Sequence, residues 1–165
     1  MANYGYKGKY YLQATVRRDG SSRFGANKKF ANFGSVGASW IISDESFMSG
    51  LKSGFLDELK IKASYGSAGN QSGLNDFQSR ELYGRGVYNG VSGLIQNNLA
   101  NPELQWERKT TLNAGVEFST FKGRFTGAVE YYNSITSDLF LNRQLSRTTG
   151  NRFIATNIGE LQNKG

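Results

Sequence analysis

The stretch TTLNAGVEFSTFKGRFTGAVEYY, from Thr110 to Tyr132, alternates apolar and polar side chains on both sides of a short basic turn. One face of each run carries the apolar residues: Leu112, Ala114, Val116 and Phe118 before the turn, then Phe125, Gly127, Val129 and Tyr131 after it. Side chains of a β-strand point alternately to opposite faces, so each run is interpreted as a strand. Two such strands joined at FKGRF, where Gly123 permits a sharp reversal, predict a β-hairpin.

The same alternation recurs along much of the upstream chain. It covers Tyr10–Val16, Phe30–Ile42 and Leu59–Tyr65, and a second short basic turn, YKGKY, lies at Tyr6–Tyr10. The sequence therefore predicts an all-β, antiparallel fold with about five full strands plus partial ones.

The predicted connections differ in length according to the end of the sheet at which they lie. One end has the two basic turns and a connector over residues 43–58; the other has DGSSRFGANKK (19–29) and two long segments over residues 67–107 and 136–156. Short turns at one end and long loops at the other are typical of a transmembrane β-barrel of the outer membrane. A soluble antiparallel sheet or sandwich remains an alternative on the pattern alone.

Aromatic residues at the strand ends favour the membrane. Trp106 and Phe118 share a face twelve residues apart, about 40 Å along a strand and about 30 Å along the membrane normal after a tilt of about 40°. That span approximates the apolar band of a barrel with its flanking aromatic girdles. The expected membrane-interface aromatics are Tyr6, Tyr10, Trp106, Phe118, Phe121 and Phe125. Core packing is the alternative role for each ring.

Composition and charge exclude several classes of function. The 165 residues contain no Cys and no His, which removes disulfides, thiolate chemistry and imidazole-based mechanisms. The net charge is +7, but the basic residues are spread along the chain, so nucleic acid is not an expected partner. No apolar run is long enough for a signal peptide or a membrane helix.

Catalysis is not expected, and neither a cofactor nor a metal is predicted. Asp44 and Glu45 are better explained as the first turn of a short helix capped by Ser43 than as an acid pair. Glu117 and Glu130 lie on the polar faces of adjacent predicted strands, where lining of a lumen is favoured over a glycosidase dyad. The Gly-rich segment GSAGNQSG lacks the GK[ST] ending of a phosphate-binding loop.

Aromatic residues in the forty-residue segment after Ser67 are the best candidates for ligand contact. Phe77, Tyr83 and Tyr88 stand among Asn, Gln and Arg. Aromatic faces stack on sugar rings while amides and guanidinium groups bind hydroxyls, so these three residues are candidate substrate contacts. Packing within the loop is the alternative role.

Six stretches, in order and over nearly the whole chain, resemble the SusC/RagA family of TonB-dependent outer-membrane transporters. They are ATVRRDGSSRFG (14–25), GASWIISDE (37–45), LKIKASYGSAGNQ (59–71), NPELQWE (101–107) leading into LNAGVEF (112–118), VEYYN (129–133) followed by DLFL (138–141), and NIGELQNKG (157–165). RDGSSRFG is the most specific part of the resemblance.

The resemblance implies a barrel of about 22 strands that is plugged by an N-terminal domain. Residues 1–165 would be part of that barrel domain, and the plug domain is expected to be absent from this chain. The family imports oligosaccharides or peptides across the Gram-negative outer membrane, with TonB and a SusD-like lipoprotein as partners and outer-membrane lipid around the barrel.

The alternative of a different class is a soluble or surface-exposed β-sheet domain that binds glycans or polyanions. The two interpretations differ in the structure they predict. A barrel segment should form an open, curved antiparallel sheet with an unpaired strand at each edge, an apolar outward face and its long loops gathered at one end.

Overall fold

The computed structural model describes residues 1–52 and 55–165, and its regular structure is almost entirely β. The strands are β1 (Ala2–Tyr6), β2 (Tyr10–Gly20), β3 (Phe30–Ile41), β4 (Leu56–Asn70), β5 (Leu82–Tyr88), β6 (Val91–Asn98), β7 (Glu107–Thr120), β8 (Phe125–Ser137), β9 (Phe140–Gln144), β10 (Phe153–Asn157) and β11 (Glu160–Lys164). Short helical turns are η1 (Ile42–Asp44), η2 (Ser46–Met48), α1 (Ser49–Lys52) and η3 (Arg147–Thr149). No helix in the described ranges is long and apolar enough to cross a membrane.

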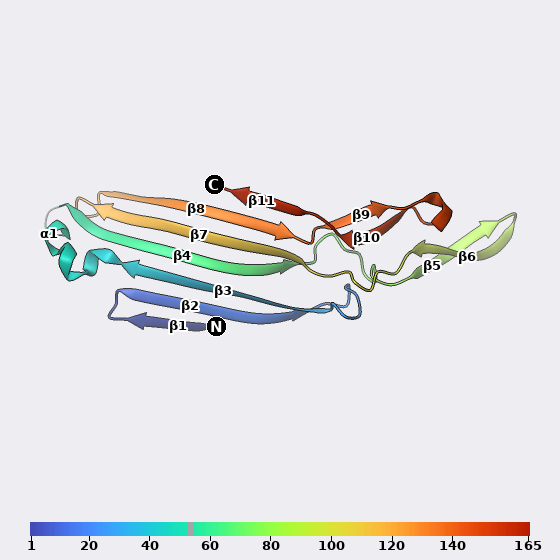
Figure 1. Ribbon diagram of the computed structural model, residues 1–165, viewed down its shortest axis with the longest axis horizontal. Coiled ribbons are helices and arrows are strands. Elements are labelled where there is room, and N and C mark those ends of the chain that lie inside the picture. The colour runs from blue at the N-terminus through green and yellow to red at the C-terminus, as the bar shows by residue number, and fades with distance from the viewer. Residues whose placement is uncertain (53–54) are drawn as a thin grey trace.

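Seven strands form one antiparallel sheet in the order β1-β2-β3-β4-β7-β8-β11 (Figure 1). Consecutive strands of this sheet are neighbours once the hairpins β5–β6 and β9–β10 are set aside as excursions. Within the described residues, β1 pairs only with β2 and β11 only with β8. The sheet is therefore open with two unpaired edges, which confirms the predicted architecture.

The strand register confirms the two predicted faces. Val116 lies opposite Ile61 on β4 and Val129 on β8, while Glu117 lies opposite Lys60. The apolar face is defined by two rows across the strands, Tyr4-Leu12-Ala38-Ala63-Ala114-Tyr131 and Tyr6-Tyr10-Trp40-Ile61-Val116-Val129. The polar face carries Gln13, Ser39, Lys60, Lys62, Asn113, Glu117 and Glu130.

Turns and loops separate to opposite ends of the sheet, as expected. The short-turn end holds the turns at residues 7–9 and 121–124 and the helical connector, and the long-loop end holds the segments 21–29, 71–106 and 138–159 (Figure 1). Large apolar side chains on the apolar face remain exposed between these ends, among them Val36, Tyr65 and Val129 at 47%, 56% and 70%. An isolated sheet would leave this surface in water, so it requires a covering phase or partner.

The expected capped helix in the connector was wrong in its geometry. Ser43 lies inside the 3-10 turn η1, and its buried hydroxyl has no hydrogen-bond partner within the described part of the chain. Glu45 adopts an extended conformation (φ −77°, ψ 148°), which divides the segment into short turns. Residues 53 and 54 of the connector lie outside the described residues.

Glu45 fastens this connector to the sheet. Its carboxylate accepts hydrogen bonds from the Tyr10 hydroxyl (2.6 Å) and the Trp40 indole N–H (3.2 Å), and pairs with Lys9 Nζ (3.2 Å). These three groups stabilise the charged form, the Tyr10 hydrogen bond most, and so they lower the pKa of Glu45 below its usual 4.5.

Replacing Glu45 with Gln should remove a pH-dependent contribution to stability. A carboxyl whose pKa is lower in the folded than in the unfolded state stabilises the fold above the unfolded value, and this contribution disappears as pH falls through the folded value. Urea midpoints of wild type and Glu45→Gln should therefore differ at neutral pH and converge below pH about 4. Glu58→Gln, an exposed carboxylate at the same end, is the control. An offset that persists unchanged in acid would contradict the role assigned to Glu45.

Both long segments contain hairpins that were not predicted. β5 and β6 are joined by Asn89 and Gly90 with φ values of 50° and 82°, the backbone of a two-residue type I′ turn. Asn-Gly is the strongest short-range hairpin signal, but here it lies inside a Gly- and Asn-rich tract where the alternation of side chains is weak. The second hairpin, β9–β10, occupies most of the excursion between β8 and β11.

Candidate functional site

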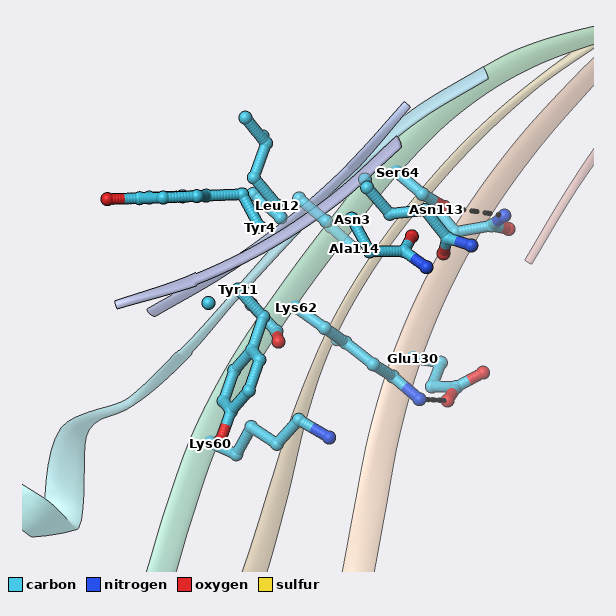
Figure 2. Close-up of a pocket in the computed structure, with 17 residues that line it drawn as sticks. Asn3, Tyr4, Tyr11, Leu12, Lys60, Lys62, Ser64, Asn113, Ala114 and Glu130 are labelled. Atoms are coloured by element: carbon cyan, nitrogen blue, oxygen red, sulfur yellow. Dashed lines mark hydrogen bonds and ion pairs between the residues drawn. The ribbon is translucent and has the colours of Figure 1, made fainter. Parts of the chain in front are cut away.

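A hollow of about 830 Å³ lies on the polar face of the sheet, near its middle. Its lining includes Asn3, Tyr11, Lys60, Lys62, Asn113 and Glu130. Figure 2 shows Lys62, Glu130 and Asn113 on one side of the strands, with Tyr4 and Leu12 projecting to the other. Strand alternation therefore separates a polar lining from an apolar exterior.

An ion-pair network crosses three strands of this polar face. Lys62 contacts both Glu117 (Nζ to Oε1, 2.6 Å) and Glu130, and Lys60 lies 3.3 Å from the other oxygen of Glu117. Two cations and two anions balance, and all four side chains are partly exposed. Such an exposed network contributes little to the free energy of folding, and its main effect is to fix the positions of the four side chains.

Gly115 creates the space for this network. It lies between Lys62 and Glu130 in the register, and its missing side chain allows the lysine to reach across β7. A Cβ there would stand 3.1 Å from Glu130 Cγ and 3.2 Å from Lys62 Cε.

We expect Gly115→Val to break the Lys62–Glu130 contact while preserving the sheet. Overpacking of this kind costs about 1–3 kcal/mol, measured as a lower urea midpoint. Gly37→Val is the matched control, because a Cβ at Gly37 meets its nearest neighbour at an ordinary 3.5 Å. Equal losses in the two variants would show that the space at Gly115 has no special importance.

The two carboxylates of the polar face are both partners in this ion-pair network. Glu117 and Glu130 contact the same Lys62 ammonium group from adjacent strands. No cluster of His, Cys, Asp and Glu in residues 1–52 and 55–165 could hold a metal ion.

The cluster of buried hydrophobic residues lies among the long loops, and Phe33 on β3 is a buried hydrophobic residue of the sheet beside it. Phe24, Leu74, Leu104 and Ala155 form this cluster, with Trp106 and Phe140 packed against it. These residues come from all three connections at the long-loop end. The loops 21–29, 71–106 and 138–159 are therefore packed together as one cluster, called here the loop cluster.

Asparagine side chains and close backbone contacts also hold the three segments of the loop cluster together. Asn101 donates to the carbonyl of Ala155 (2.7 Å), and Asn157 donates to the carbonyls of Gln105 and Asp138 (both 2.8 Å). At Gly25, an added Cβ would stand 1.7 Å from the Pro102 carbonyl oxygen, so only glycine fits.

The three loop aromatics predicted to contact substrate are not brought into one site. Phe77 is half-exposed, with the Arg80 guanidinium 5.4 Å from its ring centroid, and Tyr83 donates a 2.6 Å hydrogen bond to Glu81. Tyr88 stands at the tip of the β5–β6 hairpin with 88% of its surface exposed. Tyr83 and Tyr88 are five residues apart on β5 and so point to opposite faces of the hairpin.

Five of the six proposed interface aromatics cluster at the short-turn end. Ring pairs there are Tyr6–Tyr10 (6.2 Å between centroids), Tyr10–Trp40 (6.0 Å), Phe55–Phe121 (4.9 Å) and Phe118–Phe125 (5.9 Å). The sixth, Trp106, packs 4.6 Å from Phe24 and donates its N–H to the Lys29 carbonyl at the long-loop end. The membrane role of all six remains a prediction.

The sequence pattern did not identify the core residues of the loop cluster or the partners in the ion-pair network. Phe24 lies within the RDGSSRFG motif, but nothing local distinguishes it from the other Phe residues in loops. The alternation over Leu59–Tyr65 predicts that Lys60 and Lys62 share the face opposite Ile61, which is correct, but their partners depend on the register of β4 against β7.

A curved antiparallel sheet with an apolar outer face, a polar inner face, short turns at one end and long loops at the other defines the wall of a β-barrel of the outer-membrane class. The family model described as "TonB dependent receptor-like, beta-barrel" matches residues 1–165. This chain belongs to that family.

Individual relatives agree with this assignment. A TonB-dependent receptor of Formosa agariphila is 42% identical over 98% of this chain and 15% of its own length, and the TonB-dependent receptor SusC of Bacteroides thetaiotaomicron is 32% identical over 99% and 17%. The solved structure of the RagAB peptide transporter superposes with a TM-score of 0.87 at 31% identity, covering 99% of this chain and 18% of that one. The chain thus spans less than a fifth of the relatives it matches.

Proposed function

We propose that this chain forms part of the wall and extracellular mouth of a TonB-dependent outer-membrane transporter that imports oligosaccharides or peptides. The observation that carries the proposal is the full-length match to the barrel family together with the two-faced sheet. The polar face would line the lumen, the apolar face would meet outer-membrane lipid, and the loop cluster would form the mouth. Transport in this proposal involves no chemical step, cofactor or metal.

The partners proposed are TonB, which would supply energy, and a SusD-like lipoprotein, which would cover the mouth. Both would act on the intact protein. The names of the relatives SusC and RagAB support this proposal, and the loop cluster is the part of this chain that a covering lipoprotein would meet.

A soluble or surface-exposed β-sheet domain that binds glycans or polyanions is the second candidate. The basic net charge of +7 favours it. The large exposed apolar side chains across the sheet and its two unpaired edges oppose it, because both promote aggregation in water.

Substrate contact by the loop aromatics is tested by an uptake assay on the complete gene product that contains these residues. Tyr88→Ala should reduce uptake of a labelled oligosaccharide or peptide by up to about tenfold, the amount expected when a stacking interaction worth about 0.5–1.5 kcal/mol is lost. Phe77→Ala and Tyr83→Ala should have smaller effects, since Arg80 and Glu81 already engage their side chains.

Val87→Ala is the matched control, because Val87 is 70% exposed on the same strand of the hairpin. Uptake should disappear in a host without TonB. A complete gene product that remains in the soluble fraction, or uptake that is independent of TonB, would overturn the proposed function.

A further inference from the structure

Three small residues interrupt the apolar face in one row across the sheet. Ala38, Ala63 and Ala114 are neighbours on β3, β4 and β7. The rows above and below them carry larger side chains, Val36-Tyr65-Leu112 towards the long loops and Trp40-Ile61-Val116 towards the short turns. The row of alanines therefore forms the floor of a trough on an otherwise bulky surface.

The β2 side of this trough is a defined groove of about 360 Å³. Ala38 and Ala63 form its floor, and its walls are Tyr4, Leu12, Ile61 and the stacked rings of Tyr10 and Trp40. The polar atoms of that ring pair are directed to Glu45 (2.6 and 3.2 Å). These hydrogen bonds hold the Tyr10 and Trp40 rings in place, so that the carbon atoms of the rings face the groove.

The distance from the short turn to the groove is smaller than the thickness of one membrane leaflet. Leu12 lies four residues beyond Gly8 in the short turn, about 13 Å along the strand and about 10 Å along the normal of a barrel tilted by about 40°. Half of the hydrocarbon core measures about 15 Å. An acyl chain from the leaflet at the short-turn end would reach the groove.

A cation lies near the short-turn end of the groove, beside Tyr6, whose ring centroid is 6.2 Å from that of the lining residue Tyr10. The Lys7 ammonium lies 5.2 Å from the ring centroid of Tyr6, a residue of the apolar face, and it forms no ion pair with any described residue. Two carboxylates at this end are engaged by other groups, because Glu45 is paired with Lys9 and Asp57 accepts from the Gly123 amide. Lys7 is therefore available to an anionic headgroup.

We propose that this groove binds the acyl chain of a phospholipid whose phosphate is held by Lys7. The inference rests on the proposed function, because it requires the apolar face to meet lipid. The bound lipid would cover the alanine floor and lie against the Tyr10–Trp40 pair that anchors the connector.

The test uses the complete gene product, purified in mild detergent and titrated with dioleoylphosphatidylglycerol under native mass spectrometry. Ala38→Leu with Ala63→Leu should reduce lipid retention about tenfold, because the added side chains exclude roughly two methylene groups from the groove. Lys7→Gln should reduce retention of this anionic lipid more than that of dioleoylphosphatidylcholine, whose phosphate is already neutralised in part by its own choline cation. Ala114→Leu, in the same row but outside the groove lining, should retain lipid as wild type does.

Equal retention by wild type and the double leucine variant would overturn the proposal. The proposal would also be overturned if the wild type formed a dimer that the double leucine variant lost while lipid retention stayed the same. That result would assign the groove to a second copy of the chain. Recovery of the wild type from the membrane fraction, in a form whose gel migration changes on heating, reports the proposed function independently. Membrane recovery without retained lipid would therefore overturn the groove alone.

Discussion

Replacing Phe24 with Ala is expected to loosen the whole long-loop end while leaving the sheet assembled. Phe24 is 1% exposed, lies 4.6 Å from the Trp106 ring and 6.1 Å from Phe140, and its carbonyl accepts a hydrogen bond from Ser79 (3.0 Å). Truncation of a fully buried Phe costs about 3–5 kcal/mol. That amount approaches the stability of a small packed cluster, so the loops should separate.

Limited proteolysis of the complete gene product measures this effect. Cleavage within residues 71–106 and 138–159 should accelerate strongly in Phe24→Ala, and uptake should fall with it. Phe153→Ala, which truncates a ring that is 51% exposed in the same cluster, should change neither by a comparable amount. Unchanged cleavage in Phe24→Ala would mean that the loops do not depend on their shared core.

Replacing Phe121 and Phe125 together by Ser should weaken membrane assembly. The rings are 57% and 59% exposed at the short-turn end, where they have few protein contacts to lose beyond Phe55 and Phe118. Burial of one such ring in an apolar phase is worth about 1.5–3 kcal/mol. The double variant should therefore lose several kcal/mol on insertion if these residues lie in the interfacial belt.

The amount of heat-modifiable protein in the membrane fraction measures assembly. Phe47→Ser, which changes a ring that is 68% exposed in the connector at the same end, is the control. Molecules that do assemble should bind ligand normally, since the loop cluster lies at the opposite end of the strands (Figure 1). Normal assembly with impaired ligand binding would contradict the interfacial role of both rings.

The hairpin Thr110–Tyr132 shows which structural features the local sequence pattern predicts and which it does not. The alternation places Val116 on one face and Glu117 on the other, and the structure agrees. The turn itself contains more strain than its glycine suggests, because Phe121 and Lys122 also adopt positive φ (56° and 59°). Local sequence preference does not favour that geometry in such residues, so contacts with the connector, such as Phe55 against Phe121, help to hold it.

The alternating faces were determined by the sequence itself, because a side chain's face depends only on its parity along the strand. The division into a short-turn and a long-loop end was also determined by the sequence, because the spacing between alternating runs sets the length of each connection. The loop cluster, the Lys62 network and the alanine groove were decided only by the tertiary structure. Phe24 meets Leu104 and Ala155 across more than 75 residues of chain, and Lys62 finds Glu117 and Glu130 only after three strands align. A shift of one residue in the register of β4 would move Lys62 to the opposite face, away from both carboxylates.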